Sequence, residues 1–418
     1  MKHSIITLFI SLIALCDASA QTTLRDYRDE VLAYSHEVEL SELAVEGANA
    51  DMRRANKGYL PRLDLSREAS LNFRHASGVR PWGWSTNATI SQPIFDGGGV
   101  RAAAKRSKLA YDKSLVDDSL VRLDVIYAAD AAYWRLSRAA AYRDIIREYV
   151  AAVDSLRTVV ERRFAEGYSA KGDLLQIESR MSDARYQLSS AEQSYTIALH
   201  NYNSLRGADI GSDVLLGESI FDERAMPCRV SVDDVVDGHP RYRSAQLSME
   251  HARWGIRAAV APFLPAIDVV AYGTLQPKIP HVKGGGLYGD GAVVLSFATP
   301  IFHFGERCHA ARSAKAKYMQ QIVAMEQTAD DIALIEGDAW ANIYNTHRRV
   351  EAARASLDLA RENLDMSIYS YGEGLGTILD VLQAQISWLQ IYQNVVAAYY
   401  DYAMAIASYE YVTAKKLF

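Results

Sequence analysis

The sequence predicts a mainly α-helical protein with a small β part, built from a duplicated unit. The segments Glu166–Gln176 and Glu373–Gln383 share Glu, Gly, Asp, Leu and Gln at matching places, 373 − 166 = 207 positions apart. The triplet Pro93–Phe95 recurs at the same separation as Pro300–Phe302. Self-similarity at a fixed separation indicates two structural repeats within one architecture.

The amino terminus has the features of a secretory signal. Lys2 precedes an apolar run, Ile5–Leu15, and the small triplet Ala18–Ala20 follows as a cleavage site. We therefore expect residues 1–20 to be a signal peptide. A lipoprotein would instead use Cys16, but the leucine before it is larger than the small residue that such processing prefers.

Composition limits the function classes. With 45 basic against 51 acidic residues, the chain lacks the basic excess that binds nucleic acid. Beyond the signal only Cys228 and Cys308 remain, and we expect both to be free, buried thiols. The most apolar later stretch, Trp388–Ala407, contains polar residues, unlike a membrane helix. Soluble export and a membrane span made of strands both stay open.

Each repeat contains a predicted β-hairpin. In the first, 62–92, apolar and polar residues alternate, and Trp82 and Trp84 lie on one face as a possible interfacial aromatic belt. The second, 266–300, alternates more weakly around a Gly- and Pro-rich loop at Gln276–Asp290. The alternation also fits a small soluble sheet with one face on a core.

Long amphipathic stretches surround these hairpins. Gly99–Glu166 contains no interior Gly or Pro, and a helix of that length is about 100 Å long. The turns near Gly167 and Gly374 reverse the chain into a return helix. The predicted helices are Leu24–Gly58, Gly99–Glu166 and Leu174–Leu205 in the first repeat, and Val232–Val260, Arg307–Tyr371 and Ile378–Leu417 in the second.

The predicted domain organisation follows from this layout. It consists of the signal peptide 1–20, the first repeat 21–206, a connector or equatorial segment 207–231, and the second repeat 232–418. Four strands cannot close a barrel, and an open edge in hydrocarbon leaves backbone groups unpaired. If the hairpins enter a membrane, several copies must therefore combine their strands.

In its order of motifs the chain resembles the TolC family of outer-membrane efflux proteins, from about Thr22 to Phe418. The resemblance rests on the duplicated layout and the two turn motifs, with Leu-Pro before each hairpin, Pro-Ile-Phe-x-x-Gly after it, and His239-Pro240 opening a helix. It implies a homotrimer with a twelve-stranded transmembrane β-barrel, continued by a long periplasmic α-helical barrel. It also implies location in the outer membrane of a Gram-negative-type bacterium.

The resemblance further implies a porin-like exit duct of a tripartite efflux or secretion system. Such a duct conducts substrates passively and is not an enzyme, and it needs no cofactor. Its expected partners are a periplasmic adaptor, or membrane fusion protein, an inner-membrane pump of the RND or ABC type, and outer-membrane lipid. The sequence does not identify the cargo or the pump.

The two turns are the sites that the resemblance assigns to the adaptor. Gly167, Tyr168, Gly374 and Leu375 would form the tips that meet the adaptor's helical hairpins. Glycine has a physical reason there, because a helix that reverses commonly needs a residue with positive φ. The alternative is that these residues are helix caps without a partner.

The periplasmic aperture is assigned in the same way, to Asp380, Asp173, Tyr371 and Gln383. Both aspartates also suit the first turn of a helix, where exposed N–H groups favour a carboxylate. Some relatives carry a second aspartate at the position of Gln383 and an arginine at that of Gly376. We therefore expect a weaker cation filter and a mouth less tightly held by ion pairs.

The rival class is a secreted, soluble coiled-coil scaffold whose hairpins pack on their own helices. It explains the long helices and the signal, but not the duplication. A metal site at Cys308-His309 is disfavoured, because adjacent ligands on a helix diverge. No catalytic motif supports an enzyme.

Overall fold

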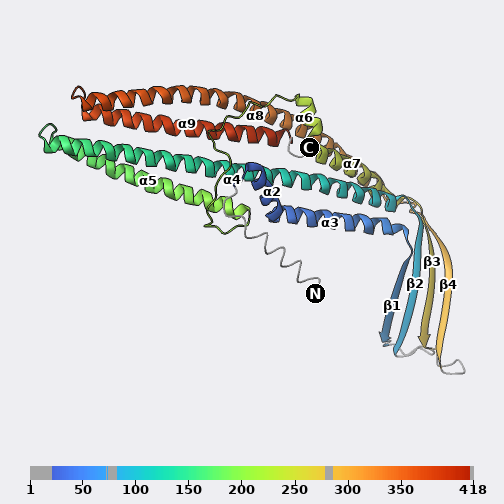
Figure 1. Ribbon diagram of the computed structural model, residues 1–418. Coiled ribbons are helices and arrows are strands. Elements are labelled where there is room, and N and C mark those ends of the chain that lie inside the picture. The colour runs from blue at the N-terminus through green and yellow to red at the C-terminus, as the bar shows by residue number, and fades with distance from the viewer. Residues whose placement is uncertain (1–20, 72, 74–81, 278–285, 415–418) are drawn as a thin grey trace, which may run out of the picture. The chain divides into compact units, whose positions relative to one another are not determined.

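The computed structural model describes residues 21–71, 73, 82–277 and 286–414 (Figure 1). The predicted signal peptide lies outside the described residues. The helices are α2 (Leu24–Tyr34), α3 (His36–Asn56), α4 (Gly99–Ala165), α5 (Lys171–Leu205), α6 (Val232–Gly238), α7 (Pro240–Val260), α8 (Glu306–Gly372) and α9 (Ile378–Val412). The strands are β1 (Arg62–Leu71), β2 (Trp82–Asp96), β3 (Ala266–Pro277) and β4 (Leu287–Ala298), and short 3-10 turns, η1 (Lys57–Tyr59) and η2 (Ala261–Phe263), precede β1 and β3.

The chain forms two compact units, and each long helix contributes to both. The first unit comprises the described parts of Met1–Leu40, Ser119–His239 and Asp331–Phe418. The second comprises those of Ser41–Asp118 and Pro240–Asp330. The turns and the return helices therefore belong to the first unit, and the sheet belongs to the second.

The first predicted helix of each repeat is interrupted, so the prediction of continuous helices was wrong. Ser35 is extended between α2 and α3, and its hydroxyl accepts a hydrogen bond of 3.4 Å from the Val38 N–H, as an N-cap does. His239 is extended between α6 and α7 because the following Pro240 disfavours helical geometry in the residue before it.

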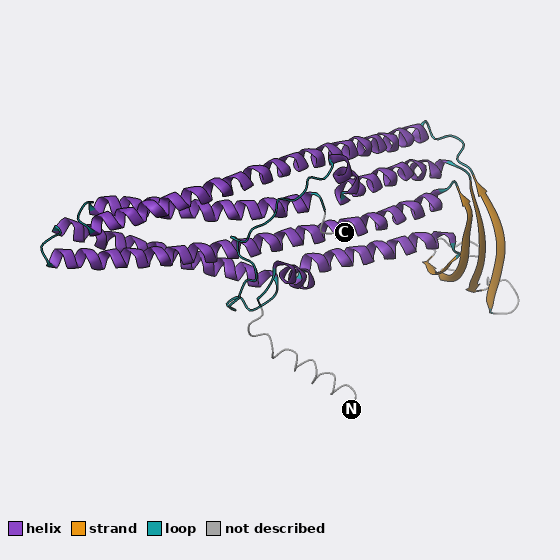
Figure 2. Ribbon diagram, turned by 45° about the horizontal axis from the view of Figure 1, so that its top comes forward, coloured by secondary structure: helices purple, strands orange, loops and turns teal. Residues whose placement is uncertain are grey.

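The two long helices, α4 and α8, each have 67 residues, and their bounds agree with the prediction to within one residue. The return helices α5 and α9 each have 35 residues and run back beside α4 and α8 (Figures 1 and 2). No helix in the described ranges has an apolar stretch long enough to cross a bilayer.

The four strands form one antiparallel sheet in chain order, β1-β2-β3-β4 (Figure 2). Strands β3 and β4 are longer than predicted, because they extend into the expected Gly- and Pro-rich loop. The register aligns an apolar row across all four strands: Leu63, Ile90, Ala271 and Val293. The predicted alternation therefore places apolar side chains on a common face of the sheet.

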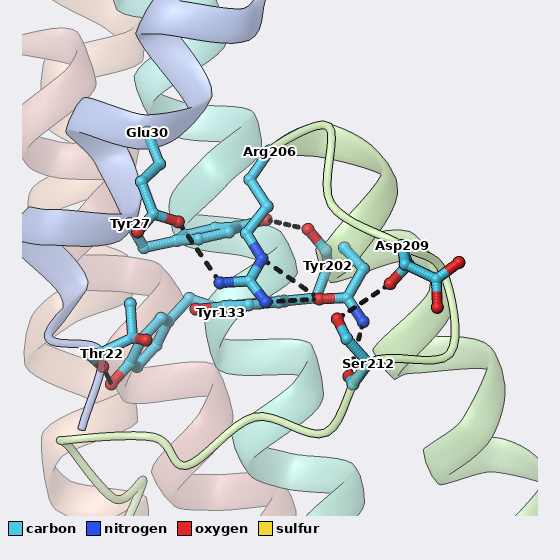
Figure 3. Close-up of polar contacts among 9 residues, drawn as sticks. Thr22, Tyr27, Glu30, Tyr133, Tyr202, Arg206, Asp209 and Ser212 are labelled. Atoms are coloured by element: carbon cyan, nitrogen blue, oxygen red, sulfur yellow. Dashed lines mark hydrogen bonds and ion pairs between the residues drawn. The ribbon is translucent and has the colours of Figure 1, made fainter. Parts of the chain in front are cut away.

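The core of the first unit contains a stack of tyrosines (Figure 3). The rings of Tyr27 on α2 and Tyr202 on α5 lie 3.9 Å apart and nearly parallel, and the Tyr27 hydroxyl donates to the Tyr202 carbonyl over 3.0 Å. Burial raises the pKa of Tyr27 and that of Tyr202, so both stay protonated. Arg206, directly after α5, forms an ion pair of 3.4 Å with Glu30 of α2. These contacts fasten α2 to the end of α5.

Each long helix also carries one fully buried carboxylate that an arginine from another segment neutralises. Arg28 on α2 binds both oxygens of Asp130 on α4, at 2.5 and 3.0 Å. Arg229 in the connector binds both oxygens of Glu336 on α8, at 3.1 and 2.9 Å. The positions are almost equivalent in the two repeats, because 336 − 207 = 129 is next to 130.

Replacing Arg28 by alanine should destabilise the first unit strongly, because the buried Asp130 carboxylate would lose the arginine that binds both of its oxygens. We expect a loss of about 3 kcal/mol, at the lower end of the range for broken buried pairs since Arg28 is itself partly exposed. The measurement is the unfolding free energy of the detergent-solubilised protein. Arg25→Ala, an exposed residue on the same helix, should change it little, and equal effects would contradict the assignment.

Candidate functional site

The two helix reversals of the first unit have the same backbone geometry, that of a Schellman motif. Gly167 has φ 81°, its N–H bonds to the Phe164 carbonyl at 3.1 Å, and the next N–H bonds to the Arg163 carbonyl at 2.8 Å. Gly374 has φ 76°, and the equivalent bonds are 3.1 and 2.8 Å. Each motif satisfies carbonyls left open at the end of a long helix. Side chains with a Cβ are strained at positive φ, which explains both glycines.

The residue after each glycine is large and exposed. Tyr168 is 75% exposed and Leu375 is 84% exposed, although the residue at this position of a Schellman motif commonly packs back on its helix. Both turns therefore present an apolar side chain to their surroundings.

Arg163, in the last turn of α4, joins the two turns. Its Nη1 donates to the carbonyl oxygens of Tyr371 and Gly372 at 2.6 and 3.2 Å, at the C-terminal end of α8. A cation is favoured there because the helix dipole leaves partial negative charge on those carbonyls. Arg163 was not among the residues predicted from the sequence. The available signal was a basic residue in the last turn of a long helix.

Tyr371 is buried between the turns, with 5% of its surface exposed. The Arg163 guanidinium lies 4.9 Å from the centre of its ring, and its hydroxyl lies 3.3 Å from the hydroxyl of Ser169 in the other turn. Within this unit, therefore, its hydroxyl and its carbonyl both link the α8–α9 turn to the α4–α5 turn.

Asp380 and Asp173 occupy equivalent positions, the third residue of α9 and of α5. Asp380 Oδ2 accepts from the Thr377 N–H at 2.9 Å and from the Thr377 hydroxyl at 2.7 Å, and the Thr377 hydroxyl accepts from the Asp380 N–H at 3.3 Å. Within the described residues Asp173 accepts only from the Ala170 N–H, at 3.3 Å, since alanine has no hydroxyl to donate or accept. The second turn therefore has the complete capping box.

The capping bonds affect the charge of Asp380. The Thr377 hydroxyl and then the Thr377 backbone N–H lower the pKa of its carboxyl below the usual value. The side chain is exposed, and within the described residues its other oxygen accepts no hydrogen bond. Asp380 is therefore an ionised carboxylate that caps α9 and still faces its surroundings.

Gln383 lies one turn beyond Asp380, in a groove between α5 and α9. The groove has a volume of about 600 Å³ and is also lined by Gln176, the equivalent residue of the first repeat. The remaining lining residues are Ser179, Arg180, Asp183, Leu379, Leu382 and Ile386. Tyr371 and Gln383 were both assigned to the aperture, but they lie in different environments. Tyr371 contacts Arg163, and Gln383 lines this groove.

The other predicted residues lie in the second unit or the connector. Trp82 is exposed, whereas Trp84 is half-buried and has the Arg67 guanidinium 4.9 Å from its ring centre. Cys228 and Cys308 are free as expected, but both are exposed, so the prediction of buried thiols was wrong. Among the described residues no three His, Cys, Asp or Glu side chains form a group able to hold a metal.

Long paired helices, return turns and a small sheet are the features of a class of channel proteins, and comparisons with known proteins support this class. The family model described as outer membrane efflux protein matches residues 27–208 and 232–408. The outer membrane efflux protein BepC of Brucella suis is 24% identical, over 92% of this chain and 83% of that protein. Outer membrane protein TolC of Escherichia coli is 22% identical, over 92% and 80%. The crystal structure of VceC from Vibrio cholerae matches with TM-score 0.79 and 18% identity, over 93% and 95%.

The chain belongs to the outer membrane efflux protein family, because the family model covers most of its length. It is an outer-membrane protein that extends into the periplasm and acts as an exit channel for efflux or secretion. The expectations of family, fold class and location are confirmed. The alternative of a secreted, soluble scaffold is set aside.

Replacing Arg163 by methionine should loosen the α8–α9 turn, because the side chain loses its donors but keeps an apolar stem. A hydrogen bond from a charged group contributes about 1.5 kcal/mol, so we expect about tenfold faster amide exchange in the turn. Hydrogen–deuterium exchange of peptides covering 366–380 measures this. Arg162→Met, the exposed neighbour, is the matched control. Equal rates in the two variants would contradict the assigned role.

Proposed function

We propose that this protein is the outer-membrane exit duct of a tripartite efflux or secretion system, working as a homotrimer. A periplasmic adaptor, or membrane fusion protein, engages the two turns, and an inner-membrane pump of the RND or ABC type delivers the cargo. The duct conducts passively, without a catalytic step or a cofactor. The two repeats, 21–206 and 232–418, contribute equivalent elements, and the connector 207–231 joins them after removal of the signal 1–20.

The observation that carries the membrane part of the proposal is the exposed apolar face of the sheet. Leu63, Leu65, Leu295 and Val293 are each at least 70% exposed, and all face the same side. Such a face needs an apolar environment, which lipid provides. Trp82 and Trp84 lie at one end of it, where interfacial aromatic residues are expected.

The need for several copies follows from the edges of the sheet. Strands β1 and β4 each pair on one side only, so their outer N–H and C=O groups have no partner strand in the described chain. Within hydrocarbon each unpaired group costs several kcal/mol. Three copies would join β4 of one to β1 of the next and close a sheet of twelve strands.

The adaptor contact is supported by the geometry of the turns. Tyr168 and Leu375 project from matching Schellman motifs, and their exposed apolar surface suits the apolar stripe of a helical hairpin. Arg163 would hold the two turns of one subunit in a fixed relation, so an adaptor would meet a preformed surface.

For the aperture, we propose that Asp380 from three copies forms a ring that favours cations, with Asp173 adding charge nearby. Tyr371 and Gln383 would adjust the mouth without adding charge. Gly376 and Gln383 replace ionic groups of some relatives, and Arg163 binds the α8 carbonyls from the other turn. The gate would thus depend on the hydrogen bonds that Arg163 makes within one subunit, and less on ion pairs.

A photo-crosslinking amino acid at Leu375 should capture the periplasmic adaptor in the native host, and mass spectrometry would identify it. In a second variant the crosslinker stands at Tyr168 and Leu375 is replaced by Asp. This variant should capture the adaptor about tenfold less, since burying one leucine is worth roughly 1.5–3 kcal/mol. A crosslinker at Leu215, an exposed residue of the connector, is the control. Capture of this chain alone from both turns would refute the docking assignment.

Asp380→Asn should lower the cation selectivity of the channel in a planar bilayer, because it removes one charge per subunit and leaves an acceptor for Thr377. The wild-type selectivity should persist to lower pH than an ordinary aspartate would allow, and decline only as the pH falls through the lowered pKa of this carboxyl. Asp365→Asn, an exposed position on α8, serves as the comparison. Unchanged selectivity in D380N would remove Asp380 from the filter.

A further inference from the structure

A cavity with an unusual charge distribution lies in the second unit, between α4, α7 and α8. Its volume is about 550 Å³, within the range of pockets that hold small organic ligands. Most of its walls are alanine and glycine, including Ala259 and Gly255 of α7 and Ala314 of α8. Small side chains on facing helices leave this space open.

Three nitrogen-bearing side chains, one from each helix, line the cavity. They are Arg106 of α4, His251 of α7 and Lys317 of α8. The lining includes no carboxylate, and among the described residues none of the three forms an ion pair. The Nε of Arg106 is buried without a hydrogen-bond partner. A buried donor of this kind costs free energy unless a ligand satisfies it.

We propose that this cavity is a binding site for a small organic anion, with a carboxylate or phosphate held by Arg106 and Lys317 and an apolar body against the alanine walls. The planar guanidinium matches the two oxygens of such a group, and the flexible ammonium adds a second charge. The proposal is independent of the gate and of the adaptor contact.

His251 adds a hydrogen-bonding group at the same place. Burial and the nearby charge of Arg106 lower the pKa of its imidazole, so the ring is neutral at pH 7 and can donate one hydrogen bond without further charge. An anion in the cavity would relieve the repulsion among the basic groups. The site therefore has a physical preference for a negative ligand over a neutral one of equal shape.

The test uses the full-length protein in amphipol, with 2-naphthoate as the soluble probe and 2-naphthalenemethanol as its uncharged counterpart. We expect saturable binding of the naphthoate, at least tenfold tighter than that of the alcohol. Arg106→Gln and Lys317→Gln should each weaken naphthoate binding about tenfold. Lys315→Gln, two residues away and outside the cavity, should leave it unchanged.

Dihexanoyl phosphatidic acid, tested alongside, distinguishes the sources of the anion. Binding of naphthoate but not of this lipid would support a soluble cargo or metabolite, whereas preference for the lipid would support a phospholipid headgroup. Both results uphold an anion site. The proposal would be overturned if neither naphthoate nor the lipid bound saturably, or if the alcohol bound as tightly as naphthoate. It would also be overturned if K315Q and R106Q weakened naphthoate binding equally.

A second variant keeps the proposal testable if loss of Arg106 impairs folding. Ala259→Glu places a carboxylate on the cavity wall, where it can pair with the unpaired cations and occupy the space. We expect a higher thermal midpoint together with loss of naphthoate binding. A lower midpoint with naphthoate binding retained would contradict a cavity that attracts anions.

Discussion

The burial of one carboxylate in each long helix is the constraint on which the first unit depends. Asp130 and Glu336 are fully enclosed, and for each an arginine from a separate segment binds both oxygens, which compensates for the cost of burying a carboxylate. Arg28 thereby fixes α2 against α4, and Arg229 fixes the connector against α8. The two carboxylates lie at nearly equivalent positions of the two repeats, so α4 and α8 each carry one buried carboxylate. The stacked rings of Tyr27 and Tyr202 in addition pack α2 against α5 (Figure 3).

The same duplication produces the two helix reversals at Gly167 and Gly374. A helix of 67 residues ends with several unsatisfied carbonyls, and the Schellman geometry at Gly167 and Gly374 satisfies them locally. Arg163 then binds further carbonyls of the partner helix and makes the two turns one structural element. The exposed residues Tyr168 and Leu375 are consequently held on a common support, which would reduce the entropy lost in the adaptor contact that we propose.

The turns are held by contacts within one chain, whereas the sheet is left with open edges. Its strands alternate so that an apolar row crosses all four, but β1 and β4 leave open edges. Helices of the same unit surround a cavity lined by Arg106, His251 and Lys317, which form no ion pair within the described residues. The open edges and the cavity are the two parts of the second unit to which our proposals assign outside molecules, further copies of the chain and a small anion.

The sequence by itself determined the duplication, the periods of strand and helix, the glycine turns and the family, because these depend on residues close together in the chain or on a fixed separation. The prediction of continuous helices through Ser35 and His239 was wrong. Ser35 caps a new helix, and Pro240 disfavours helical geometry at His239. The prediction of buried thiols was also wrong, since Cys228 and Cys308 are exposed. Only the tertiary structure decided the contacts of Arg163, Arg28 and Arg229 and the cavity around Arg106. These contacts join residues about a hundred or more positions apart, and no local pattern specifies which partner an arginine finds.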